Sequence, residues 1–265
     1  MQSAIRIPVL MYHRIGEAHN DWEARYCISP QLFSEQMRML AAQGMRACTI
    51  DDFIAWLNGG RPLPEGSFLL TFDDGYLGVY EHAVSVLKQL DWPATIFLVS
   101  QLIGKEDQWC RAENPGGVTY PLLTPEHIRS MRKDGFSFHS HTRLHADLPA
   151  LSDAQLKDEL SGSKQDLEDM FGEPVTCLAY PFGHHDERVL SLTSQAGYAA
   201  AFSTRPGFNR LDADRFRISR LDIYGTDTPA MLMRKIKFGT NDGSIQNALR
   251  YYWSRFRTHC GATAQ

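Results

Sequence analysis

The sequence lacks any apolar run close to the roughly 20 residues that a helix needs to cross a bilayer. Its amino terminus also lacks the uninterrupted apolar core of a signal peptide, because Arg6, Pro8, His13 and Arg14 interrupt the first 15 residues. From these two absences we expect a cytoplasmic protein. No internal repeat is visible, so a solenoid is not expected.

Cysteine is scarce and follows no pattern. The five cysteines are odd in number and include no C-x-x-C pair, which argues against a disulfide framework and against a zinc knuckle. We expect all of them to be reduced and structural: Cys27, Cys48, Cys110, Cys177 and Cys260.

Basic charge is confined to one end of the chain. The net charge is −4, yet residues 231–265 hold six Lys or Arg and a single Asp, so the preceding part is more acidic than the total indicates. Nucleic acid is not expected as a partner of such an acidic body.

The length and the pattern of elements favour one α/β domain. A chain of 265 residues falls within the range of a single α/β barrel, and about seven strand-like runs alternate with helical patterns. This alternation predicts a parallel sheet, either a (β/α) barrel or a doubly wound sheet. We therefore expect one domain over 1–265, with 226–265 as a carboxy-terminal helical extension.

Two adjacent carboxylates, Asp73 and Asp74, follow an apolar run that is typical of a buried parallel strand. Neighbouring buried carboxylates need a cation, a shared proton or water. Gly75 allows a sharp turn just after them. Taken alone, the stretch Thr71–Gly75 could equally be a surface turn with a helix cap.

Histidines also follow strand-like runs. His13 ends the first run, and His141 and His145 lie four apart beyond another run. Together with one Asp they offer two nitrogens and one oxygen, which suits a catalytic zinc site, although an isolated H-x-x-x-H is more often a solvated pair. Because the carboxyl ends of parallel strands share one face, we expect these groups to converge there.

The motifs T-F-D-D-G, H-T-x-x-H and Y-P-F-G, in this order, resemble the polysaccharide deacetylases of carbohydrate esterase family 4, the NodB-homology domain, over roughly residues 5–225. The resemblance implies a distorted (β/α)7 barrel and a divalent metal, with Zn²⁺ expected ahead of Co²⁺ or Ni²⁺. It further implies Asp73 as general base, Phe182 N–H as oxyanion donor, and three metal ligands: Asp74, His141 and His145.

Two positions depart from the family pattern. Ala179 stands where the family usually carries an Arg that partners the base, and Arg217 or Arg220 is the candidate replacement. The usual Leu-x-His near the carboxyl end is missing, whereas Met11-Tyr12-His13 resembles the circularly permuted branch that includes poly-N-acetylglucosamine deacetylases. This resemblance makes His13 the general-acid candidate, the alternative being a His that hydrogen bonds a neighbouring loop.

These observations predict metal-dependent N-deacetylation of an N-acetylhexosamine unit, with N-acetylglucosamine expected, in a bacterial polysaccharide or its lipid-linked precursor. Acetate would be released. Two alternatives stay open: a catalytically silent glycan-binding module, and a deformylase or other amide hydrolase on the same scaffold. The exact glycan, the native metal, the oligomeric state and the roles of His139, His184 and His185 are left open by the sequence.

Two further segments carry predictions. The irregular loop 101–122 is long enough to be a binding loop, and Trp109 and Tyr120 there could stack on a sugar or simply pin the loop. Residues 244–257 combine an apolar stripe with flanking basic residues, which suits peripheral contact with the inner membrane. Packing of that stripe on the barrel is the alternative.

Overall fold

The computed structural model describes residues 6–211 and 213–250. Within this part a parallel sheet of eight strands follows the order β10-β1-β5-β6-β7-β8-β9, and β4 pairs with the first half of β5. The strands are β1 (Val9–Tyr12), β4 (Arg46–Cys48), β5 (Ser67–Phe72), β6 (Thr95–Leu98), β7 (Ser137–Ser140), β8 (Cys177–Ala179), β9 (Ala200–Phe202) and β10 (Leu221–Asp222).

The sheet curls into a ring that closes between its first and last strands. Ile218 forms a parallel bridge with Phe202 of β9, and three residues later Leu221 of β10 pairs with Leu10 of β1. Seven strands therefore surround one interior, which confirms the distorted (β/α)7 barrel. The additional strand β4 was not predicted, because it is only three residues long and partly exposed.

Each barrel strand is buried on both faces. In β5, Leu70 belongs to the outer core beneath the helices, whereas Leu69 belongs to the core inside the barrel. This explains why the strand sequences are continuously apolar rather than alternating. The interior core also contains Phe97 and Phe202, whose ring centroids lie 5.2 Å apart.

Helices surround the ring and begin where the sequence provides caps. Ser29 accepts a hydrogen bond from Leu32 N–H ahead of Pro30, and Thr228 does the same for Met231 N–H ahead of Pro229. The α-helices are α1 (Glu23–Tyr26), α2 (Pro30–Ala42), α3 (Ile50–Leu57), α4 (Val84–Leu90), α5 (Pro125–Lys133), α6 (Asp153–Lys157), α7 (Ser163–Phe171), α8 (Glu187–Gln195) and α9 (Pro229–Phe238).

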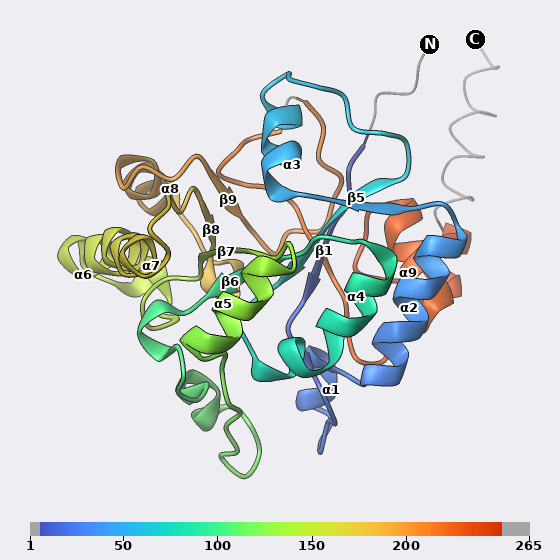
Figure 1. Ribbon diagram of the computed structural model, residues 1–265, viewed down its shortest axis with the longest axis horizontal. Coiled ribbons are helices and arrows are strands. Elements are labelled where there is room, and N and C mark those ends of the chain that lie inside the picture. The colour runs from blue at the N-terminus through green and yellow to red at the C-terminus, as the bar shows by residue number, and fades with distance from the viewer. Residues whose placement is uncertain (1–5, 212, 251–265) are drawn as a thin grey trace.

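The two ends of the barrel differ. At the amino ends of the strands, Phe53 and Trp56 of α3 join the interior core and close that end. Figure 1 shows α3 on one side of the sheet and α1 on the opposite side, together with the green segment that corresponds to loop 101–122. The carboxyl ends of the strands are therefore the end that remains open for a site.

The carboxy-terminal segment is partly packed on the barrel. Leu232 and Ile236 of α9 belong to the outer core, and Gln36 of α2 donates to the Asp227 carbonyl. Residues 245–250 are helical, with Ile245 and Leu249 65% and 64% exposed. The rest of the predicted stripe and its basic flank lies outside the described residues: Tyr252, Trp253, Arg255, Phe256 and Arg257.

Two further findings concern the described part of the chain. It contains no helix that is both long enough and apolar enough to cross a membrane. The cysteines within it are free and buried, as expected: Cys27, Cys48, Cys110 and Cys177. Cys260 lies outside it.

Candidate active site

The aspartate pair lies immediately beyond β5, in a turn that only a few residue types can form. Asp74 has a φ of 71° and Gly75 a φ of 80°. The positive φ favours glycine, and a Cβ at Gly75 would lie 2.6 Å from Leu98 Cδ2, so the Leu98 side chain would have to move to admit it. Left-handed backbone at Asp74 is strained, and such strain clusters at functional sites.

The two predicted histidine ligands reach the same carboxylate from the loop after β7. His141 Nδ1 lies 2.8 Å from the Ala179 carbonyl, so this nitrogen is the donor and Nε2 carries the free lone pair. His141 Nε2 and His145 Nε2 lie 3.3 and 3.4 Å from Asp74 Oδ1. The three ligand atoms therefore form a compact cluster, all within 4.8 Å of one another.

This cluster has the chemistry of a divalent-cation site. Asp74 Oδ1 is buried and has no hydrogen-bond partner among the described residues, although buried polar atoms are normally paired. Burial raises the pKa of Asp74, but the adjacent imidazoles of His141 and His145 outweigh it, and the pKa falls to about 2. Burial lowers the pKa of His145 to about 3. An ionised carboxylate and a neutral imidazole are the forms that bind metal.

Asp73 is held by an arginine that directly precedes β10, two strands away from β5 in the ring. Arg220 is fully buried, its two terminal nitrogens lie 2.6 and 2.7 Å from the two Asp73 oxygens, and its Nε donates to the Ser203 carbonyl. Burial raises the Asp73 pKa, but the charges of Arg220 and His141 and the Arg220 hydrogen bonds lower it overall. Arg217 instead pairs with Asp214 and Glu187 in an exposed setting. Of the two arginines that the sequence offered as partners of the base, Arg220 is therefore the one that contacts Asp73.

His13 follows β1 and lines the same pocket as both aspartates. Its Nδ1 is buried and unpartnered within the described chain, and its ring meets Tyr26 edge-on at 5.4 Å. Asp222 of β10 also lines the pocket, and burial raises its pKa. Sequence reasoning missed Asp222, although its place at the end of a late strand-like run was an available signal.

The turn after β8 is strained in the same way as the aspartate turn. Phe182 has φ 57° and ψ 0°, and a Cβ at Gly183 would lie 2.1 Å from Thr204 Oγ1. The Phe182 ring meets His145 edge-on at 4.7 Å and remains 42% exposed. Of the five non-glycine residues with positive φ in the described chain, four lie in these site loops: Asp74, Thr142, His145 and Phe182.

Loop 101–122 forms one wall of the pocket. The Trp109 ring stacks on His145 with centroids 4.5 Å apart and planes at 19°. Tyr120 instead pins the loop, because its hydroxyl donates to Glu23 Oε1 at 2.7 Å and its ring lies 3.5 Å from the Arg14 guanidinium carbon. Glu23 is the centre of this arrangement and was not predicted, since a lone acidic residue in a polar stretch gives no local signal of burial.

The three histidines without a predicted role occupy different places. His139 is buried 6.3 Å from the Phe97 ring, and burial lowers its pKa to about 4. His185 Nδ1 lies 2.8 Å from the Gly183 carbonyl beside the strained turn, and His184 pairs with Asp147 in an exposed setting.

Comparison with known proteins gives three kinds of match. The polysaccharide deacetylase family model matches residues 60–201. The poly-beta-1,6-N-acetyl-D-glucosamine N-deacetylase of Staphylococcus aureus is 26% identical over 214 residues, covering 73% of this chain and 70% of that protein. A polysaccharide deacetylase from Bacillus cereus is 29% identical with a TM-score of 0.74, covering 88% and 69% of the two chains, and IcaB from Ammonifex degensii is 26% identical with a TM-score of 0.71, covering 84% and 93%.

Proposed function

The chain belongs to the polysaccharide deacetylase family, and from that premise we propose that it is a metal-dependent hydrolase that N-deacetylates an N-acetylhexosamine unit. N-Acetylglucosamine is the expected sugar, in a bacterial polysaccharide or its lipid-linked precursor, and the staphylococcal relative named for such a polymer supports this substrate. The observation that carries the proposal is the cluster of Asp74, His141 and His145 beside the Arg220-bound Asp73 in one pocket.

Asp74 and His145 are already in ligand form, whereas burial of His141 is outweighed by the charges of Asp73 and Asp74, which raise its pKa, so His141 would release a proton on binding the ion. Asp74, His141 and His145 would hold the ion, with Zn²⁺ preferred for a set of two nitrogens and one oxygen. When bound, such an ion polarises the acetamide carbonyl and lowers the pKa of a water molecule to about 7. The Ala179 carbonyl fixes the tautomer of His141 through its Nδ1–H.

Asp73 is placed to take the proton from the attacking water. Its pKa is lowered overall, so it is ionised near neutral pH and able to accept. The bidentate bond from Arg220 fixes the plane of the carboxylate. A base held in this way acts on a water that is positioned beside the acetamide carbon.

The second half of the reaction needs a proton donor and a stabilised oxyanion. Collapse of the tetrahedral adduct breaks the C–N bond, and the leaving nitrogen must be protonated, which His13 can do from the end of the neighbouring strand β1. The N–H of Phe182, at the strained turn, is the proposed oxyanion donor. The products are acetate and a glucosamine unit.

The glycan-binding alternative requires the chemistry to be disabled. The family's usual Arg is missing at Ala179, but Arg220 contacts the base from another strand, and this supports an active enzyme. The deformylase alternative differs only in the acyl group released.

We further propose a cytoplasmic enzyme with peripheral contact at the inner membrane. The exposed Ile245 and Leu249, with Arg250 beside them, support such contact. A lipid-carried precursor would then meet the pocket at the membrane surface.

The proposal is tested by incubating zinc-loaded protein with free and lipid-linked N-acetylglucosamine oligomers and assaying acetate and formate. Acetate release that is lost in Asp73→Asn is the expected result. Formate release from formylated analogues, without acetate release, would favour the deformylase. If neither product forms but glycan binding is retained, the silent module is favoured.

A further inference from the structure

The loop that carries both histidine ligands is strained at two of its five positions. Thr142 has a φ of 67° and His145 a φ of 61°, in the left-handed region that residues with a Cβ seldom adopt. Such a conformation persists only where the surroundings fix it. The contacts around residues 141–145 therefore indicate what holds His145 in place.

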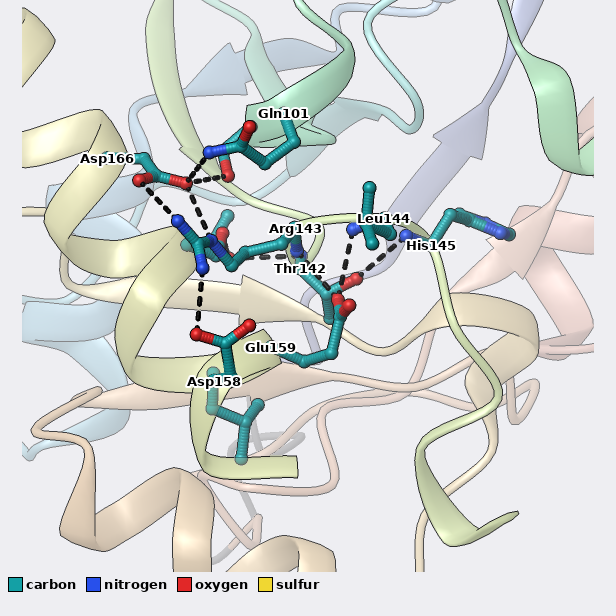
Figure 2. A network of polar contacts seen from close by, with 12 residues as sticks. Gln101, Thr142, Arg143, Leu144, His145, Asp158, Glu159 and Asp166 are labelled. Atoms are coloured by element: carbon teal, nitrogen blue, oxygen red, sulfur yellow. Dashed lines mark hydrogen bonds and ion pairs between the residues drawn. The ribbon is translucent and has the colours of Figure 1, made fainter. Parts of the chain in front are cut away.

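One carboxylate binds the middle of this loop. Glu159 Oε2 accepts hydrogen bonds from Arg143 N–H at 2.8 Å and from Leu144 N–H at 3.0 Å. These donors lie between the two strained residues, and Figure 2 shows the Glu159 side chain pointing at them. Glu159 is only 6% exposed, and charge-assisted bonds to backbone N–H groups are among the stronger hydrogen bonds.

The opposite side of the loop is bonded as well. The carbonyls of Thr142 and Arg143 accept from Ser100 N–H and Gln101 N–H, at 3.0 and 3.1 Å. The Thr142 hydroxyl accepts from His145 N–H at 3.2 Å. Hydrogen bonds on both sides therefore leave the loop little freedom to relax.

The Arg143 side chain anchors the loop to the helical segment that also carries Glu159. Its Nε donates to Asp166 Oδ2 at 3.0 Å and its Nη1 donates to Asp158 Oδ1 at 2.7 Å. Figure 2 shows Asp166 between Arg143 and Gln101, and Gln101 Nε2 donates to the same Asp166 oxygen. The anchor thus joins the ligand loop to the segment after β6.

The residues that face the loop repeat with helical spacing. Gly162 and Asp166 lie three and seven positions after Glu159, which places the three residues on one face of the helical segment. A Cβ at Gly162 would lie 2.7 Å from Arg143 Cδ, so glycine allows this close approach. This polar face begins in the π-helix η5 (Asp158–Gly162), which carries Glu159, and continues into α7.

We propose that Glu159 is a positioning residue that sets metal affinity by holding the 141–145 loop in its ligand geometry, without touching the metal. The inference rests on the proposed function, because it assumes that His141 and His145 are ligands. Neither the separation of Glu159 from the loop in the sequence nor its position on a charged helix indicates this role.

The test measures zinc affinity of the metal-free full chain by competition with a chromophoric chelator. Glu159→Ala removes the acceptor, and we expect zinc affinity to fall about 10- to 100-fold, as for other residues that orient metal ligands. Glu159→Gln keeps an oxygen that can accept both N–H groups, and we expect affinity within about threefold of wild type. A contribution to folding alone would lower the stability of Glu159→Ala without changing the zinc affinity of the folded chain.

Asp153→Asn is the matched control, because the exposed Asp153 lies on the preceding helix α6 and pairs only with Arg188 in the structure described. It should leave zinc affinity unchanged. If Glu159→Ala fails to fold, Glu159→Asp decides: it keeps the charge but shortens the side chain, and we expect at least a tenfold loss.

Two results would overturn the inference and are distinguishable. Wild-type zinc affinity in a folded Glu159→Ala variant, or in Glu159→Asp where Ala does not fold, would remove the role of Glu159 and leave the metal site intact. Failure of the wild-type chain to bind zinc would overturn the metal site and this inference together.

Discussion

Arg220 and Asp73 are 147 positions apart, yet they form a buried two-pronged ion pair with N–O distances of 2.6 and 2.7 Å. The pair crosses β1, which lies between β10 and β5 in the sheet, because Arg220 directly precedes β10 and Asp73 directly follows β5. Arg220 therefore gives the base a cationic partner, although Ala179 stands where the family usually has an Arg. The pairing of β10 with β1, which in turn pairs with β5, brings Arg220 to Asp73 and allows it to replace the missing Arg.

Replacing Arg220 should impair turnover but not metal binding. In Arg220→Gln, burial would raise the pKa of Asp73 without the opposing guanidinium charge. The base would then be protonated up to a higher pH, so the acidic limb of the pH profile of kcat should move upward. We expect kcat near neutral pH to fall about 100-fold. Steady-state kinetics across pH, with metal analysis, measures both effects.

Arg217→Gln is the control for that variant, since Arg217 carries the same charge on an exposed ion pair. It should match wild type in kcat and in pH profile. Equal impairment of the two variants would show that the Arg220 effect is not specific to Asp73.

His13→Ala should slow departure of the amine. We expect normal metal content and a kcat loss of 10²- to 10⁴-fold on ordinary acetamides, because only proton donation is removed. On an activated anilide, whose leaving group needs little protonation, the loss should be much smaller. If the variant is impaired equally on both substrates, His13 is not the acid.

Glu23 should make the pocket wall sensitive to acid. Burial raises its pKa, but hydrogen bonds from His19, Asn114 and Tyr120, with the Arg14 charge, lower it overall. A depressed pKa contributes stability above the unfolded value of about 4.3, and this stability is lost as pH falls through the folded-state pKa. Glu23→Gln should therefore lower the free energy of unfolding by about 3 kcal/mol at pH 7.

The difference between wild type and Glu23→Gln should shrink as pH drops below about 4. Urea unfolding at a series of pH values measures it, with the exposed Glu113→Gln as control. A difference that stays constant down to pH 2.5 would show that the Glu23 charge does not stabilise the wall.

Membrane contact predicts weak, salt-sensitive binding to anionic vesicles. Each basic residue near the surface contributes about 1 kcal/mol, so neutralising Arg250, Arg255 and Arg257 should abolish sedimentation with vesicles at low salt. Ile245→Ser with Leu249→Ser should weaken it through loss of apolar burial. Identical sedimentation of all chains would leave the packed-helix alternative for 244–257.

Local signals predicted the parts of the site that lie within one turn of the chain. Asp73 and Asp74 follow a strand whose apolar run is visible in sequence, and His141 and His145 are separated by one fixed spacing. Their convergence followed from the parallel topology, because the carboxyl ends of such strands share one face. The alternation of strands and helices predicted a parallel sheet, and the family resemblance selected the barrel over a doubly wound sheet.

Residues that act through long-range contacts could not be resolved in the same way. The choice of Arg220 over Arg217 depends on which side chain points into the barrel, and this is fixed by closure through Ile218. Glu159 looked like any charged helical residue, because only the packed structure shows that its carboxylate faces a strained loop. Glu23 was hidden for the same reason.

The central claim is that one aspartate of the pair is a base and the other a metal ligand. The most direct test combines metal analysis by mass spectrometry with acetate release from N-acetylglucosamine oligomers, for wild type, Asp73→Asn, Asp74→Ala and His141→Ala. We predict that Asp74→Ala and His141→Ala lose both metal and activity, whereas Asp73→Asn keeps its metal and loses at least about 100-fold in turnover. Full metal occupancy in the Asp74 and His141 variants, or undiminished acetate release by Asp73→Asn, would contradict the account.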